Sequence, residues 1–129
     1  MNGQRTQEQL RAAKAYEHVS ALAEDERKPY GSLALKLPAL LRSSGLCQSV
    51  HFLKSRNKAS ADRLLDHLGA QLYRIDPEIE DGPSLCQKAR EAEFASYLWL
   101  SREALAVATW YARLAKSELK VEPGEDNAE

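Results

Sequence analysis

Apolar residues recur at intervals of three and four along most of this 129-residue chain, which is the spacing of amphipathic helices. A helix-start signal precedes the first of these apolar segments, because Thr6 and Gln9 form a capping box. The charged run 24–28 and Pro29 close that first helix. The same spacing, together with the helix-capping and helix-breaking residues between the apolar segments, predicts six helices. They cover about residues 7–23, 29–45, 46–56, 60–74, 84–98 and 102–120.

Three of the predicted boundaries rest on specific residues. Gly45 is a typical residue just beyond a helix C-terminus, so it ends the second helix. The segment 75–84 contains two prolines, a glycine and four acids, a composition that predicts a loop. Ser101 is expected to cap the last helix, because Leu100 and Leu105 fall at the two positions of a hydrophobic staple.

Composition agrees with a helical fold. The chain contains 19 alanines and 19 leucines, but valine, isoleucine and threonine together number only 8. Because strands favour β-branched residues and helices favour alanine and leucine, a sheet is nearly excluded. The length suits a single domain. We therefore expect an all-α, compact bundle of about six helices over residues 1–120, followed by a disordered acidic tail over 121–129.

The cysteines and the hydropathy pattern indicate where the protein works. Cys47 and Cys86 lie 39 residues apart and match no metal or redox spacing, so two free thiols in a reducing compartment are expected. The first twelve residues do not contain the hydrophobic core of a secretory signal peptide. No apolar run approaches the roughly 18 residues that span a bilayer. These features predict a soluble cytoplasmic protein that does not associate with membranes.

Charge is unevenly distributed, although the net charge is only −1. Residues 36–63 carry a net +5 and residues 64–129 a net −6. On the last predicted helix, Arg102, Arg113 and Lys116 fall within about 40° of one line, together with Thr109 and Lys120. A basic line about 27 Å long spans several phosphates. It predicts nucleic-acid binding, although a solvated surface explains the same pattern.

A second basic line follows the predicted helix 46–56 and its end. Lys54 and Lys58 align there with Cys47 and His51. Two basic lines without a nucleophile suit a protein that follows a phosphate backbone without cutting it.

The sequence contains no convincing catalytic or metal site. An S-x-x-K match at 55–58 lacks the companion motifs of the acylases that use it. Cys47 and His51 share a helix face but have no further ligands at a recognisable spacing. Asp62 and Asp66 also share a face, and a solvated helix side explains them better. We expect no catalytic residue, no metal and no cofactor.

The aromatic residues divide into two groups. Tyr97, Trp99, Trp110 and Tyr111 lie in segments that are apolar nearly all round, which predicts core packing and makes base stacking the minority interpretation. Phe52 falls off the apolar stripe of its helix, so it is a candidate contact with a neighbouring helix or a partner subunit.

A DNA-reading helix-turn-helix over 37–54 is an alternative, which would make the chain a helical DNA-binding transcriptional regulator. It fits poorly. Its buried positions would fall on Ser44, His51 and Lys54, and its small position on Leu41.

Two groups of residues strongly resemble the small-subunit family of the Cmr complex, the type III-B CRISPR RNA-guided effector. The resemblance covers about residues 12–117. The first group comprises Tyr30, the run 37–41, Gly45–Leu46 and 52–55; the second comprises Tyr97, 101–105, Trp110, Arg113 and Ala115. One departure is Tyr111–Ala112, where the family pattern has an aliphatic residue and a lysine.

The resemblance implies a non-catalytic, all-helical subunit in antiviral defence. Such subunits are expected to stack head to tail along the guide and target RNA channel, against backbone subunits that cleave the target. Among the candidate nucleic-acid-binding residues, Lys54 and Arg113 occupy matched motif positions. Lys58, Arg102 and Lys116 join them through helical geometry alone.

Overall fold

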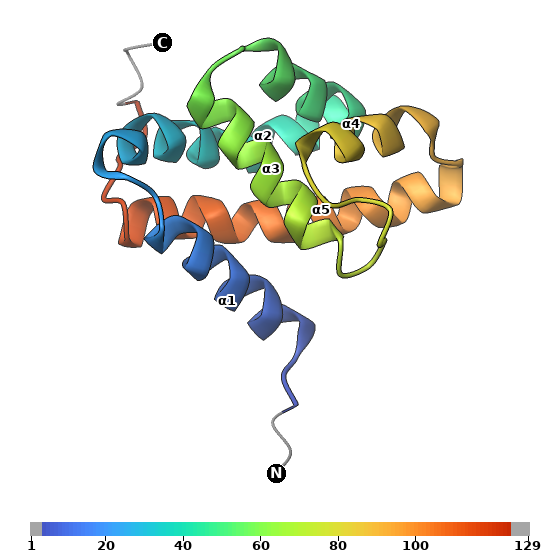
Figure 1. Ribbon diagram of the computed structural model, residues 1–129, viewed down its shortest axis with the longest axis horizontal. Coiled ribbons are helices and arrows are strands. Elements are labelled where there is room, and N and C mark those ends of the chain that lie inside the picture. Colours follow the sequence, from blue (N-terminus) through green and yellow to red (C-terminus); the bar gives the residue numbers. More distant parts are fainter. Residues whose placement is uncertain (1–3, 125–129) are drawn as a thin grey trace.

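The computed structural model describes residues 4–124, and no strand occurs in that range. The prediction of an all-α bundle is confirmed (Figure 1). Its five helices are α1 (Gln7–Ser20), α2 (Glu24–Ser55), α3 (Ala59–Leu72), α4 (Gly82–Glu91) and α5 (Phe94–Ser117). Helix α5 runs along the long axis of the molecule, α3 crosses it, and α1 projects from the bundle toward the N-terminus.

The expected helices over 29–45 and 46–56 are the two halves of α2, which accounts for five helices where six were predicted. The halves meet at Gly45, whose φ of 85° and ψ of 169° are not helical. The second half starts directly after this break because the Tyr97 hydroxyl accepts a hydrogen bond from the Cys47 N–H at 2.9 Å. Tyr97 thus satisfies a backbone donor that has no partner within the helix.

The start of the last helix was predicted wrongly. The chain is extended at Ala92 and Glu93, and α5 then continues without interruption through Ser101. Leu100 and Ala104 are both buried on the core-facing side of α5. Burial of this continuous apolar face outweighs the local helix-start signal at Ser101.

The end of the first helix was also placed too late. Helix α1 ends at Ser20, and Glu24, Asp25 and Glu26 form the first turn of α2. Acidic side chains are favourable there because they complement the positive end of the helix dipole. The Glu26 carboxylate also accepts the Ala23 N–H at 3.0 Å, which helps to start α2 at this point.

The loop predicted over 75–84 is confirmed through Asp81, which caps α4 with its side chain. The loop crosses α3 at Gly69, where a Cβ atom would lie 2.2 Å from the Asp81 carbonyl oxygen. Part of the segment expected to be a disordered tail is described: Val121 is buried, and its N–H donates to the Ala115 carbonyl at 3.0 Å. The rest of that tail, 125–129, lies outside the described residues.

Four helices meet at a polar centre inside the single apolar core. Each contributes one ring, from His18 of α1, Tyr30 of α2, His67 of α3 and Tyr111 of α5. His18 Nδ1 lies 2.6 Å from the Tyr111 hydroxyl oxygen, and His67 Nδ1 lies 2.7 Å from that of Tyr30. Burial, followed by nearby positive charge, lowers the pKa of His18 to about 4 and that of His67 to about 3.

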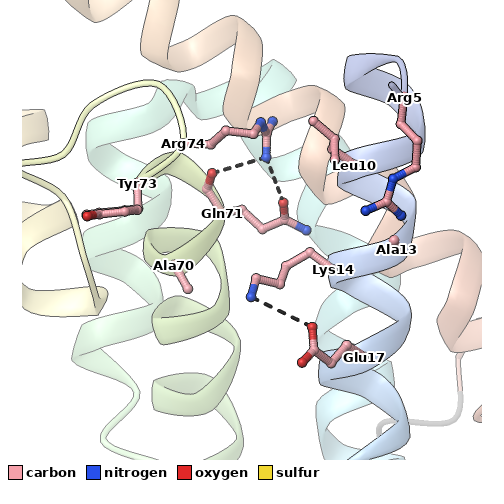
Figure 2. Close-up of a pocket in the computed structure, with 9 residues that line it drawn as sticks. All are labelled: Arg5, Leu10, Ala13, Lys14, Glu17, Ala70, Gln71, Tyr73 and Arg74. Atoms are coloured by element: carbon pink, nitrogen blue, oxygen red, sulfur yellow. Dashed lines mark hydrogen bonds and ion pairs between the residues drawn. The ribbon is translucent and has the colours of Figure 1, made fainter. Parts of the chain in front are cut away.

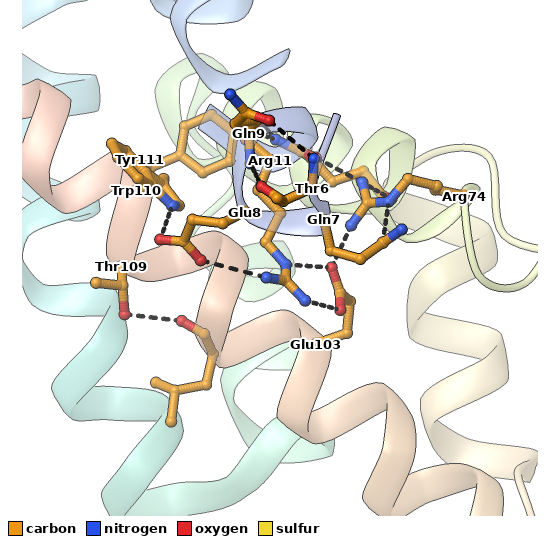
Figure 3. A network of polar contacts seen from close by, with 12 residues as sticks. Thr6, Gln7, Glu8, Gln9, Arg11, Arg74, Glu103, Thr109, Trp110 and Tyr111 are labelled. Atoms are coloured by element: carbon orange, nitrogen blue, oxygen red, sulfur yellow. Dashed lines mark hydrogen bonds and ion pairs between the residues drawn. The ribbon is translucent and has the colours of Figure 1, made fainter. Parts of the chain in front are cut away.

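A second polar cluster joins α1 and α3 to α5 (Figure 3). Glu103 on α5 is a buried residue, 6% exposed. Arg11 donates Nε and Nη2 to its two carboxylate oxygens, both at 2.8 Å, and Arg74 also bonds to it. Burial raises the pKa of the Glu103 carboxyl, but the bonds and charges of Arg11 and Arg74 outweigh it, so the net shift is downward. Glu103 therefore remains charged and holds three helices together.

Candidate nucleic-acid interface

The side chains of α5 divide between a buried face and an exposed face. The sequence-predicted cations Arg102, Arg113 and Lys116 all lie on the exposed face, opposite the buried Ala104 and Tyr111. Among the described residues, no carboxylate lies within ion-pair distance of any of these three cations. Lys120 lies beyond the end of α5 and does not extend the line.

Arg113 and Lys116 border a groove of about 330 Å³ between α2 and α5. Arg42 of α2 borders the same groove and brings a third cation to it. The rest of the lining consists of small or apolar residues, namely Leu35, Pro38, Ala39, Thr109 and Ala112. A neighbouring hollow of about 190 Å³ shares Lys116 and is also lined by Lys36 and Glu122, which carry opposite charges. The groove is therefore lined by cations from two helices.

Arg42 was missed as a site residue. It belongs to the predicted +5 segment, and it follows Leu35, Pro38 and Ala39 at steps that keep one helix face. The sequence therefore signals the face. It does not signal that this face lies against α5, because the crossing of two helices is a property of the tertiary fold.

Trp110 positions one of the groove cations. The Arg113 guanidinium lies over the Trp110 ring, with its carbon 5.0 Å from the ring centroid. Trp110 Nε1 donates to Glu8 Oε2 at 2.9 Å, which fixes the ring against α1 (Figure 3). The prediction of core packing is right for Tyr111, which is fully buried, and wrong for Trp99, which is 52% exposed.

Lys54 lies at a different place on the surface. It is exposed on the second half of α2, and with Arg90 of α4 it is among the charges that act on Cys86. Burial raises the pKa of that thiol, and these two cations partly offset the effect. His51 Nε2 lies 3.5 Å from Arg90 Nη1. Lys54 therefore belongs to the contact between α2 and α4, whereas Arg113 belongs to the groove.

Lys58 is not part of the predicted helical line. Helix α2 ends at Ser55, and Lys58 precedes α3 with an extended backbone at φ −122° and ψ 144°. Asn57, with a φ of 55°, turns the chain between the two helices. The line on α2 therefore stops at Lys54.

Phe52 is exposed, as expected from its position outside the line of apolar residues on its helix. Its side chain is 41% exposed, and Arg56 lies 5.6 Å from the ring centroid. The ring borders a small hollow of about 120 Å³, whose lining is mostly apolar, with Leu40 and Leu53, and also includes Lys36 and Arg56. This surface suits contact with an apolar side chain of another subunit.

A larger hollow, of about 570 Å³, lies between α1 and α3 (Figure 2). Two of its cations are already paired, because Lys14 lies 3.7 Å from Glu17 and Arg74 bonds to Gln71 and Glu103. Most of the positive charge that lines this hollow is therefore already paired within the protein. The α2–α5 groove is the better candidate for binding a polyanion.

One of the carboxylates considered from sequence is used within the fold. Asp66 Oδ1 accepts the Gly82 N–H at 2.8 Å at the start of α4, so this carboxylate has a structural role. Within residues 4–124 there is no cluster of three or more His, Cys, Asp or Glu that could hold a metal. In the same range, no helix is both long and apolar enough to cross a bilayer.

The bundle and its cationic groove define a small helical protein whose distinctive surface suits a polyanion. The family described as CRISPR-associated protein (Cas_Cmr5) matches residues 7–118. The chain therefore belongs to the Cmr5 family, the small-subunit family of the type III-B Cmr CRISPR complex.

One relative and one solved structure agree with this assignment. The CRISPR system Cmr subunit Cmr5 of Thermus thermophilus is 44% identical over 115 residues, which cover 88% of this chain and 96% of the relative. The crystal structure of a Cmr5 family protein from the same species superposes with a TM-score of 0.75 at 39% identity. That match covers 88% of this chain and 97% of the other. Family membership favours an effector subunit over a transcriptional regulator.

Proposed function

We propose that this chain is a non-catalytic subunit of a type III-B CRISPR effector and that its α2–α5 groove lies against RNA. It acts in the cytoplasm, in antiviral defence, and stacks head to tail with copies of itself along the guide and target RNA channel. Its partners are the backbone subunits and the two RNAs. The chain supplies surface and charge, and target cleavage belongs to other subunits.

The observation that carries the RNA contact is the convergence of Arg42, Arg113 and Lys116 on one groove. Lysine and arginine bind phosphates by displacing condensed counterions, so affinity falls steeply with salt. No described carboxylate neutralises these three side chains. Their charge is therefore available to a polyanion outside the chain.

Lys54 and Phe52 are assigned to the assembly. Lys54 provides a second cationic contact beside α4, apart from the groove. Phe52 and the hollow next to it receive an apolar side chain of a neighbouring subunit, because an exposed aromatic ring over an apolar pocket gains most from burial against a partner. Lys58 and Arg102 add phosphate contacts at the edges of these two surfaces.

The test measures binding of fluorescein-labelled single-stranded RNA by anisotropy over a range of potassium chloride concentrations. In the Arg113→Glu/Lys116→Glu variant, affinity should fall at least tenfold at low salt. The slope of log affinity against log salt should become shallower by about 0.7 for each phosphate that the variant no longer neutralises.

The matched control is Arg5→Glu/Lys28→Glu, which makes the same change in charge at two exposed cations outside the groove. Equal reductions in affinity for both double variants would show that only net charge matters and would overturn the assignment of the groove. Preference for one duplex DNA sequence in a selection assay would instead favour the regulator hypothesis.

A further inference from the structure

The sequence W-x-x-R occurs twice on α5, as Trp99–Arg102 and Trp110–Arg113. The two copies are 11 residues apart, which is about three helical turns and about 16 Å along the axis. Their angular offset around the helix is only about 20°. The two tryptophan–arginine pairs therefore lie on one side of α5, one behind the other.

The two pairs differ in how the fold uses the tryptophan. Trp110 is partly buried, its indole N–H is bound by Glu8, and the Arg113 guanidinium covers its ring. Trp99 is 52% exposed, and no described residue accepts a hydrogen bond from its Nε1. Arg102, one turn further along, is also exposed. The first pair thus offers a half-exposed indole and a cation that has no carboxylate partner among the described residues.

We propose that Trp99 and Arg102 form a base-stacking site for single-stranded RNA that continues the line of phosphate contacts made at the groove. Aromatic side chains interleaved with cations are the usual means of binding single strands, because every base has a face that can stack and every nucleotide carries a phosphate. This inference rests on the proposed RNA contact of the α2–α5 groove.

Charge distinguishes RNA from a protein partner as the occupant. Burial of Arg102 against an apolar protein surface would leave its charge without a partner, which is costly. Trp99 lies one turn from Arg102, and the same outer face of α5 continues to Arg113 and Lys116. Among the described residues, none of these three cations has a carboxylate partner.

The experiment compares Trp99→Leu and Trp99→Phe in the purified full chain, with labelled oligouridine and an RNA duplex of the same length as probes. Removal of one stacked base should weaken binding of the single strand by about tenfold or more. Trp99→Phe, which retains an aromatic face, should recover most of the affinity. The salt slope should not change, because stacking neutralises no phosphate. Duplex binding should be equal in all variants, since paired bases do not stack on the ring.

Fluorescence provides an independent measurement, since the chain contains only two tryptophans. Oligouridine should quench the emission of the wild-type protein, and this quenching should be largely absent in Trp99→Phe. The matched control is Tyr73→Leu, which removes an aromatic ring that is 55% exposed at the end of α3. It should leave binding unchanged.

The outcomes separate the two proposals. If the wild-type chain binds no RNA, the proposed function fails together with this inference. If it binds RNA and Trp99→Leu binds equally well, the stacking site alone is overturned. Normal RNA affinity combined with failure to co-assemble with other subunits would identify a protein contact at Trp99 and would also overturn the inference.

Discussion

The imidazole rings of His18 and His67 lie face to face, with their centroids 3.9 Å apart and their planes inclined by 6°. Gln71 donates its side-chain amide to the Tyr111 hydroxyl oxygen at 3.3 Å. The Tyr111 hydrogen is therefore free to point at His18 Nδ1. This arrangement requires neutral imidazoles, because two positive rings at such a separation would repel each other inside the core.

Stability should therefore fall as the solution becomes acidic. In the folded state the pKa values of His18 and His67 are about 4 and about 3, below the ordinary value of 6.5. Below pH 6.5 the unfolded chain binds protons that the folded chain does not, so the free energy of unfolding decreases from there toward pH 4. Urea unfolding at pH 7, 6 and 5 measures the decrease.

Matched histidine variants identify the source of this pH dependence. His18→Gln removes one titrating ring and should reduce the slope between pH 6.5 and 5. His51→Gln, at a histidine outside the cluster, is the matched control for the loss of an imidazole. Equal stability of the wild-type protein at pH 7 and pH 5 would rule out this account of the core.

Glu103→Gln should destabilise the bundle by about 2–3 kcal/mol, because it leaves Arg11 and Arg74 facing each other without their shared carboxylate. Chemical unfolding at neutral pH measures the change in free energy. Glu8→Gln is the matched control: it removes an exposed carboxylate that also touches Arg11, at 3.4 Å. A destabilisation below 1 kcal/mol is expected for it, and equal destabilisation by the two variants would contradict the role assigned to Glu103.

Gly45→Ala should destabilise the protein by about 1–3 kcal/mol, because its φ of 85° and ψ of 169° belong to a region that is essentially restricted to glycine. Thermal unfolding followed by circular dichroism measures the effect. Gly124 also has a positive φ, of 90°, but a Cβ there would meet no atom within 4 Å. Because Gly124 is exposed and lies outside the five helices, Gly124→Ala should change the midpoint less than Gly45→Ala does. An unchanged midpoint in Gly45→Ala would show that the break in α2 tolerates a side chain.

Lys54→Glu and Arg113→Glu should weaken RNA binding additively, since Lys54 lies beside α4 and Arg113 borders the α2–α5 groove. Separated sites usually add within about 0.5 kcal/mol. Anisotropy measurements on the two single variants and the double variant give the coupling free energy. A coupling above about 1 kcal/mol would place both cations in one binding site.

Local signals in the sequence predicted much of the fold. The capping box at Thr6 is present, with Gln9 N–H donating to the Thr6 hydroxyl at 3.0 Å. The line of Arg102, Arg113 and Lys116 is exposed as helical spacing requires. Arg42 could not be assigned to that surface, because only the crossing of α2 and α5 brings it there. The prediction at Ser101 was wrong for the same reason, since the core selects one long helix over the local cap.

The division of α5 into two faces has a consequence for how this subunit can vary. Ala104, Val107 and Tyr111 hold the bundle together from one side, while Arg102 and Lys116 face solvent on the other. Exchanges at the solvent positions remove no packing, so they are nearly neutral for folding. The affinity of the proposed RNA contact can thus be raised or lowered by single substitutions, without compensating changes in the core.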